Sequence, residues 1–205
     1  SPEITHDADP TDWVTVTFGS GFGRTNGICR FLLRSAAPDF RLYVTPINID
    51  PRCPAMPISE PPFYSAQLAK RHGPYATLGL AEDTSALTDG VLDEAGFLRL
   101  AYDIHRERER MFFHALAENE GFLACVFDLP DRIQHMFRRE GPGDGSGSLS
   151  HRQVINDTYE EMDRLIGRAM QAIPPDGILM VLSDHGFSSF HTAVNLNAWL
   201  RDNGF

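Results

Sequence analysis

The chain has 205 residues, of which 42% are hydrophobic and 22% charged, so it is long enough for one sizeable domain or a domain with a subdomain. Its formal net charge of -10, from 28 acidic and 18 basic residues, argues against a nucleic-acid polymer or an anionic membrane as partner. No apolar run is long enough for a membrane span and no signal peptide pattern is present, which leaves the compartment open and slightly favours the cytoplasm.

The first part of the chain predicts a small antiparallel sheet. Segment 19–27 is rich in glycine but fits neither GxGxxG nor GxxxxGK[ST], so we interpret it as a wide hairpin turn. Six prolines between residues 46 and 62 exclude a helix or a central strand there. We therefore predict an antiparallel β and proline-rich subdomain over residues 1–62. Its strands are expected at three segments rich in β-branched and aromatic residues: 13–18, 28–34 and 39–45.

The rest of the chain, residues 63–205, carries helical periodicity. The charge run at 106–110 is expected to form a solvated helix face. Segment 141–148, rich in glycine and serine, is expected to be a mobile loop. The three cysteines are odd in number and far apart, so they do not indicate a disulfide framework. Helices are predicted at 64–72, 97–120, 151–173 and 195–203.

Two apolar runs between these helices predict buried strands. Residues 122–127 follow the second helix, and residues 178–182 follow the third. Helix and strand in alternation are typical of right-handed crossovers. The predicted fold class is therefore α/β: a parallel or mixed sheet flanked by helices over 63–205, joined to the small antiparallel subdomain.

Each of these predicted strands leads to an acid and a histidine. Asp184 and His185 directly follow the second strand, at the sheet edge where ligands gather in open α/β folds. Asp131 and His135 are four residues apart, so on a helix they share one face and can chelate one cation. Simpler readings stay open: a turn in which Asp184 caps the next helix, and an ordinary surface pair of Asp131 with His135.

A resemblance rests on these motifs. Segment 181–187, Val-Leu-Ser-Asp-His-Gly-Phe, is followed by Val-Asn-Leu-Asn-Ala-Trp-Leu at 194–200. Together with segments 43–51, 77–84 and 131–137, they resemble the type I phosphodiesterase/nucleotide pyrophosphatase family of the alkaline phosphatase superfamily. The resemblance implies an alkaline-phosphatase-like fold and covers most of the chain from about residue 42 onward.

The resemblance also implies a chemistry. Members hold two divalent cations, so zinc is expected here, with manganese as the alternative. Asp184 and His185 are implied as ligands of one cation, and Asp131 and His135 as ligands of the other. The implied activity is metal-dependent hydrolysis of phosphodiester or phosphoric ester bonds, in a phosphate-ester small molecule or a nucleotide.

The chain departs from the family pattern in three places. The nucleophile motif, one metal-binding acid and a later histidine have no match, so no catalytic residue is assigned. We expect an internal piece of a larger hydrolase, with incomplete metal sites and little or no turnover of its own. Two alternatives stay open: a non-catalytic substrate-recognition or assembly domain, and a sulfatase or phosphomutase relative. An open sheet edge would also favour self-association.

Overall fold

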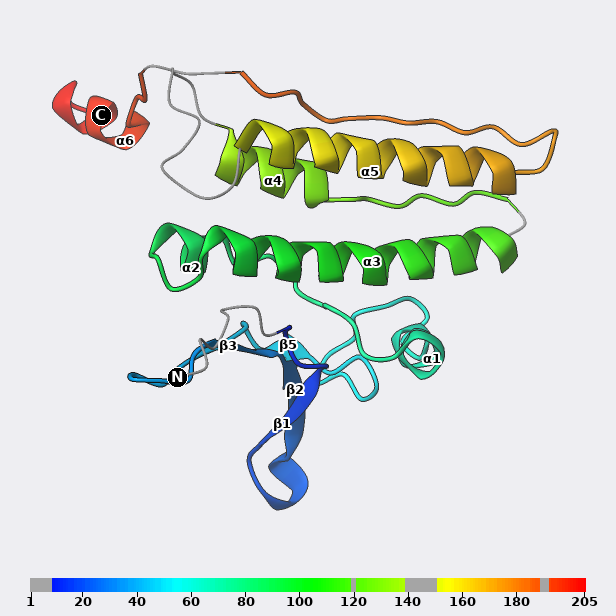
Figure 1. Cartoon of the computed structure of the whole chain (residues 1–205), viewed down its shortest axis with the longest axis horizontal. Coiled ribbons are helices and arrows are strands. Elements are labelled where there is room, and N and C mark those ends of the chain that lie inside the picture. The colour runs from blue at the N-terminus through cyan, green and yellow to red at the C-terminus, as the bar shows by residue number, and fades with distance from the viewer. Residues whose placement is uncertain (1–8, 119–120, 139–150, 189–191) are drawn as a thin grey trace.

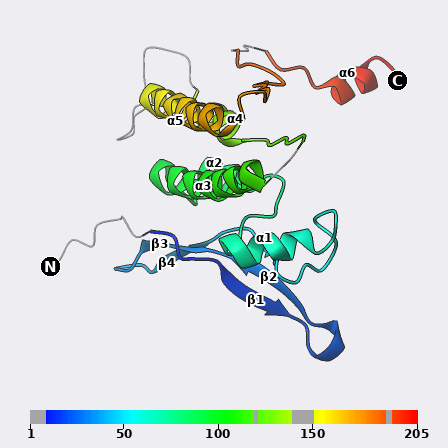
Figure 2. The ribbon, with the colours of Figure 1, turned by 90° about the vertical axis from the view of Figure 1, so that its right-hand side faces the viewer.

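The computed structural model describes residues 9–118, 121–138, 151–188 and 192–205. Within these residues the chain is mixed α/β, with small antiparallel strands and six α-helices. Figure 1 shows three tiers: the strands at the bottom, α3 in the middle and the α4–α5 pair above it. Figure 2 shows the same order when the molecule is viewed along the helices. The segment expected to be a mobile loop, 141–148, lies outside the described residues.

The predicted antiparallel strands are confirmed, with one change. β1 (Val14–Phe18) pairs with β2 (Thr25–Cys29), and β5 (Asn48–Ile49) pairs with the other edge of β2. β3 (Phe31–Ser35) pairs with β4 (Arg41–Val44) in a second sheet. The single strand predicted at 28–34 is therefore two strands, divided at Arg30. The turn between β1 and β2 holds a short 3-10 helix, η1 (Gly21–Gly23).

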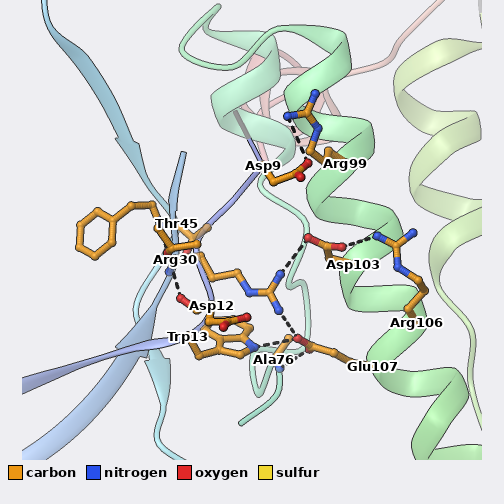
Figure 3. Close-up of polar contacts among 12 residues, drawn as sticks. Asp9, Asp12, Trp13, Arg30, Thr45, Ala76, Arg99, Asp103, Arg106 and Glu107 are labelled. Atoms are coloured by element: carbon orange, nitrogen blue, oxygen red, sulfur yellow. Dashed lines mark hydrogen bonds and ion pairs between the residues drawn. The ribbon is translucent and has the colours of Figure 1, made fainter. Parts of the chain in front are cut away.

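The side chain of Arg30, between the two strands, leaves the sheets and reaches α3 (Glu94–Glu118) (Figure 3). Its guanidinium lies 2.9 Å from Oδ2 of Asp103 and 2.5 Å from Oε1 of Glu107. The indole N–H of Trp13 donates to the same Glu107 oxygen at 2.7 Å, and the backbone N–H of Ala76 donates to the other at 2.9 Å. The side chain of Glu107 is only 4% exposed. The prediction that the whole charge run 106–110 is solvated was therefore wrong at Glu107, which is a buried link between layers.

The predicted helices are confirmed to within a few residues. α1 (Tyr64–His72) ends at Gly73, whose φ of 82° favours glycine. α5 (His151–Ala172) and α6 (Leu196–Asp202) match the predicted third and last helices. α4 (Leu129–Phe137) makes the stretch around Asp131 helical. The short α2 (Thr84–Thr88) was not predicted; the side chain of Asp83 caps it by accepting from the N–H of Ala86.

The main core lies where α3, α4 and α5 meet. It is made of buried apolar side chains from all three helices: Phe97, Ala101, Leu129, Ile133, Phe137 and Val154. Tyr159 on α5 also donates to Oε1 of Gln134 on α4 at 3.2 Å. This packing holds the buried face of α4, and so fixes which of its side chains point outward.

The prediction of buried strands at 122–127 and 178–182 was wrong. Both segments are extended, but neither pairs with a strand among the described residues. Phe122 is 91% exposed and Ile178 is 89% exposed. Figure 1 shows both running in the same direction along the α4–α5 pair. A central strand is buried only when neighbouring strands and covering helices surround it, and every strand pair in the described residues belongs to the N-terminal antiparallel sheets. A parallel sheet is therefore absent from the described part of the chain.

No helix of the described residues is long and apolar enough to cross a membrane. Cys29, Cys53 and Cys125 are free thiols.

Candidate functional site

The first pair of predicted site residues lies on α4. Pro130 stands in the first turn of this helix, where its missing N–H costs nothing. Ile133 and Phe137 bury the opposite face. Asp131 and His135 therefore share the outer face, as their spacing predicts, and Oδ1 of Asp131 lies 3.3 Å from Nε2 of His135.

The second pair arrives from the end of the extended segment that follows α5. Nε2 of His185 lies 3.6 Å from Oδ1 of Asp131 and 3.9 Å from Oδ2 of Asp184. Asp184 is exposed, and its Oδ1 accepts the backbone N–H of His185 at 3.1 Å. The two sequence pairs therefore converge, and Oδ1 of Asp131 is the atom that both histidines face.

An aromatic side chain covers one side of this cluster. The ring of Phe187 lies 4.9 Å from the ring of His135 and 5.4 Å from that of His185, centroid to centroid, with edge-on geometry. The two imidazoles are 6.4 Å apart. Phe187 thus packs against both imidazole rings.

The hydrogen bond made by His185 determines which of its ring nitrogens faces Asp131. Its Nδ1 lies 3.1 Å from the carbonyl oxygen of Gly186, which can only accept, so Nδ1 carries the hydrogen. Nε2 is then the ring nitrogen that faces Oδ1 of Asp131. That oxygen is buried and has no hydrogen-bond donor among the described residues. Two acceptors 3.6 Å apart repel each other unless a proton or a cation lies between them.

A second carboxylate and an arginine stand behind the cluster. Nη1 of Arg132 lies 3.2 Å from Oδ2 of Asp131, which leaves Oδ1 turned toward the histidines. Nε of Arg132 lies 3.9 Å from Oε2 of buried Glu82. Burial raises the pKa of Glu82 above that of a free carboxyl. Neither residue was predicted from the sequence; the position of Arg132 beside Asp131 was the one signal for it, and nothing local pointed to Glu82.

The donor set suits a zinc-like cation. Carboxylate oxygens and neutral imidazole nitrogens are both common ligands of zinc. Four side chains are enough for one tetrahedral shell, and the hydrogen bond from Nδ1 of His185 to a carbonyl is the usual outer-shell support of a metal-bound imidazole.

Comparison with known proteins gave one match. The family model described as type I phosphodiesterase / nucleotide pyrophosphatase matches residues 58–205, which is more than half of the chain. No curated protein and no solved structure matches it. The matched range contains Asp131, His135, Asp184 and His185, as well as Glu82 and Arg132.

Proposed function

Because the chain belongs to the type I phosphodiesterase/nucleotide pyrophosphatase family, we propose that Asp131, His135, Asp184 and His185 bind a zinc-like divalent cation and that this centre takes part in the hydrolysis of phosphodiester or phosphoric ester bonds. The family match supports the reaction class, and the convergence of the four side chains supports the place.

One observation carries the proposal. Oδ1 of Asp131 is buried without a hydrogen-bond donor among the described residues, yet Nε2 of His135 and Nε2 of His185 lie 3.3 and 3.6 Å away. Leaving a buried carboxylate oxygen without a partner costs about 1–3 kcal/mol or more. A cation bound at this point would satisfy the oxygen and bind both ring nitrogens at once.

The surrounding residues prepare these ligands. The carbonyl of Gly186 holds His185 in the tautomer whose Nε2 can bind metal, and Arg132 holds Oδ2 of Asp131 so that Oδ1 faces inward. Asp184, which is exposed, can turn toward the centre by rotation of its side chain. When bound, the cation would polarise a phosphoryl oxygen and lower the pKa of the attacking oxygen.

The substrate we propose is a phosphate-ester small molecule or a nucleotide. With a net charge of -10, the chain repels anions at long range, so the attraction must come from the cation and from nearby arginine. The four side chains are enough ligands for one cation, whose shell would expand to a fifth position to take a phosphoryl oxygen, and a second cation would need further ligands. We also propose little or no turnover by this chain alone, because no residue in its sequence matches the family's nucleophile motif.

Zinc titration by calorimetry, together with hydrolysis of bis(4-nitrophenyl) phosphate, tests the proposal. Asp131→Asn and His185→Gln should each weaken binding at this centre by about 100-fold or more, since even outer-shell changes cost about 10–100-fold. Asp176→Asn, a change of the same kind at an exposed turn, is the control. Unchanged zinc binding in both site variants would overturn the metal centre. Zinc-dependent hydrolysis that survives them would place the chemistry elsewhere, and preferential hydrolysis of 4-nitrophenyl sulfate would favour a sulfatase-like relative.

A further inference from the structure

A second group of metal-ligand side chains lies between α3 and α5, made of residues other than those of the proposed centre. His105 and Glu109 are four residues apart on α3, and Glu161 faces them from α5. One ligand atom from each of the three lies within 4.8 Å of the other two. In helical proteins, facing helices commonly build metal sites from such residues.

The state of His105 points to a missing partner. This residue is 2% exposed, and its Nε2 has no hydrogen-bond partner among the described residues. Burial lowers its pKa, so the ring is neutral near pH 7 and carries a lone pair. The ring of Phe127 lies 5.7 Å away between centroids, which makes this side of the group apolar. A buried imidazole beside two carboxylates and without a partner suits a cation better than water.

The two carboxylates each keep one oxygen available. Arg168 contacts Oε1 of Glu109, and Arg164 contacts Oε2 of Glu161. No hydrogen bond or ion pair within the described ranges uses Oε2 of Glu109 or Oε1 of Glu161. The arginine side chains are 57% and 61% exposed, so both can turn into solvent when a cation arrives. The arginines therefore balance the charge of the two carboxylates and leave one oxygen of each open to a cation.

We propose that His105, Glu109 and Glu161 form a second site for a zinc-like divalent cation, which ties α3 to α5. Zinc bonds of about 2.1 Å in a tetrahedron place ligand atoms about 3.4 Å apart. Closing from 4.8 Å to that spacing needs only side-chain rotation by two glutamates, which have several rotatable bonds. Water would complete the shell. With three protein ligands buried in a helix interface, the role we assign is to stabilise this pair of helices.

Zinc titration of a chain that also carries Asp131→Asn and His185→Gln separates this site from the proposed catalytic centre. One zinc ion should still bind to that chain. Adding Glu161→Gln or Glu109→Gln should then weaken its affinity by about 100-fold or more, because a direct ligand is lost. Glu160→Gln makes the same change on the exposed neighbour of Glu161 and should leave the affinity unchanged.

Two readouts decide the outcome. Binding of zinc should raise the melting temperature, because it favours the folded state, and Glu161→Gln should abolish the rise. It should also shift the imidazole nitrogen signals of His105 in an NMR spectrum. Absence of zinc binding in the chain lacking the first centre would overturn the proposal, as would equal affinity of the Glu161→Gln and Glu160→Gln variants. Neither result depends on hydrolysis, so failure here leaves the proposed function standing.

Discussion

Replacing Arg30 by methionine should destabilise the chain far more than the same replacement of an exposed arginine. Arg30 is 13% exposed and lies 2.5 Å from the buried carboxylate of Glu107. Its guanidinium also stacks on the ring of Trp13, 4.8 Å from the ring centre. Methionine keeps much of the apolar stem but leaves Glu107 with only the N–H donors of Trp13 and Ala76.

The expected loss follows from the burial of Glu107. Breaking a buried ion pair by removing one partner costs about 3–5 kcal/mol, because a charge is left uncompensated. For a chain of this size, each kcal/mol lowers the melting temperature by roughly 2–4 °C, so a drop of roughly 6–20 °C is expected. Arg106→Met is the control: this arginine pairs with Asp103 from a side chain that is 53% exposed, and exposed pairs contribute about 0–1 kcal/mol.

Urea unfolding followed by circular dichroism measures the effect. The loss of unfolding free energy in Arg30→Met should also depend on pH in a defined direction. Burial raises the pKa of Glu107, so the folded state takes up a proton at a higher pH than the unfolded state does. Because the charge of Arg30 lowers this pKa, the pKa of Glu107 is higher still in Arg30→Met; the loss of stability is complete above that higher pKa and shrinks as the pH falls through it. A loss no larger than that of Arg106→Met, or one that grows on acidification, would refute the role of the ion pair.

Two further predictions concern stability. Phe97→Ala removes a buried side chain, 1% exposed, from the core between α3, α4 and α5, and should lower the free energy of unfolding in urea by about 3–5 kcal/mol. A loss below about 1 kcal/mol would contradict the packing described. Glu82→Gln should raise stability by about 1 kcal/mol at pH 8, because Oε2 of Glu82 is buried without a hydrogen-bond partner among the described residues and burial raises the pKa of this carboxyl. The cost of the wild-type charge is complete above that raised pKa and is lost as the pH falls below it toward the pKa of the unfolded chain, so the gain should disappear on acidification; a gain that increases at low pH would contradict the assignment.

The helices could be predicted because their pattern is local. The apolar stripe of α5 and the glycine after α1 are both visible within a few turns of sequence. The runs at 122–127 and 178–182 could not be placed by the same reasoning. An apolar run is typical of a buried strand, but burial is decided by neighbours, and the described residues supply no strand on either side of these segments.

The candidate site, too, could be predicted from the sequence only in part. The spacing of Asp131 and His135 predicts one helical face, and α4 provides it. The contact of His185 with the same carboxylate depends on the path of the chain after α5, and the spacing of residues in the sequence does not show that path. Glu107 was assigned to a solvated face because it stands in a run of charges, and its partner Arg30 is 77 positions away in sequence, where no local pattern could show it. The spacing of His105 and Glu109 was the one local signal for the second cluster, and Glu161 could come only from the packing of two helices.

Anomalous diffraction at the zinc absorption edge, from crystals grown with zinc, tests the proposed centre most directly. We expect a peak bonded to Oδ1 of Asp131 and to Nε2 of both His135 and His185, at about 2.0–2.2 Å. Crystals that show no peak between these three side chains, or that show the two histidines facing away from Asp131, would contradict the assignment of this cluster as the metal centre.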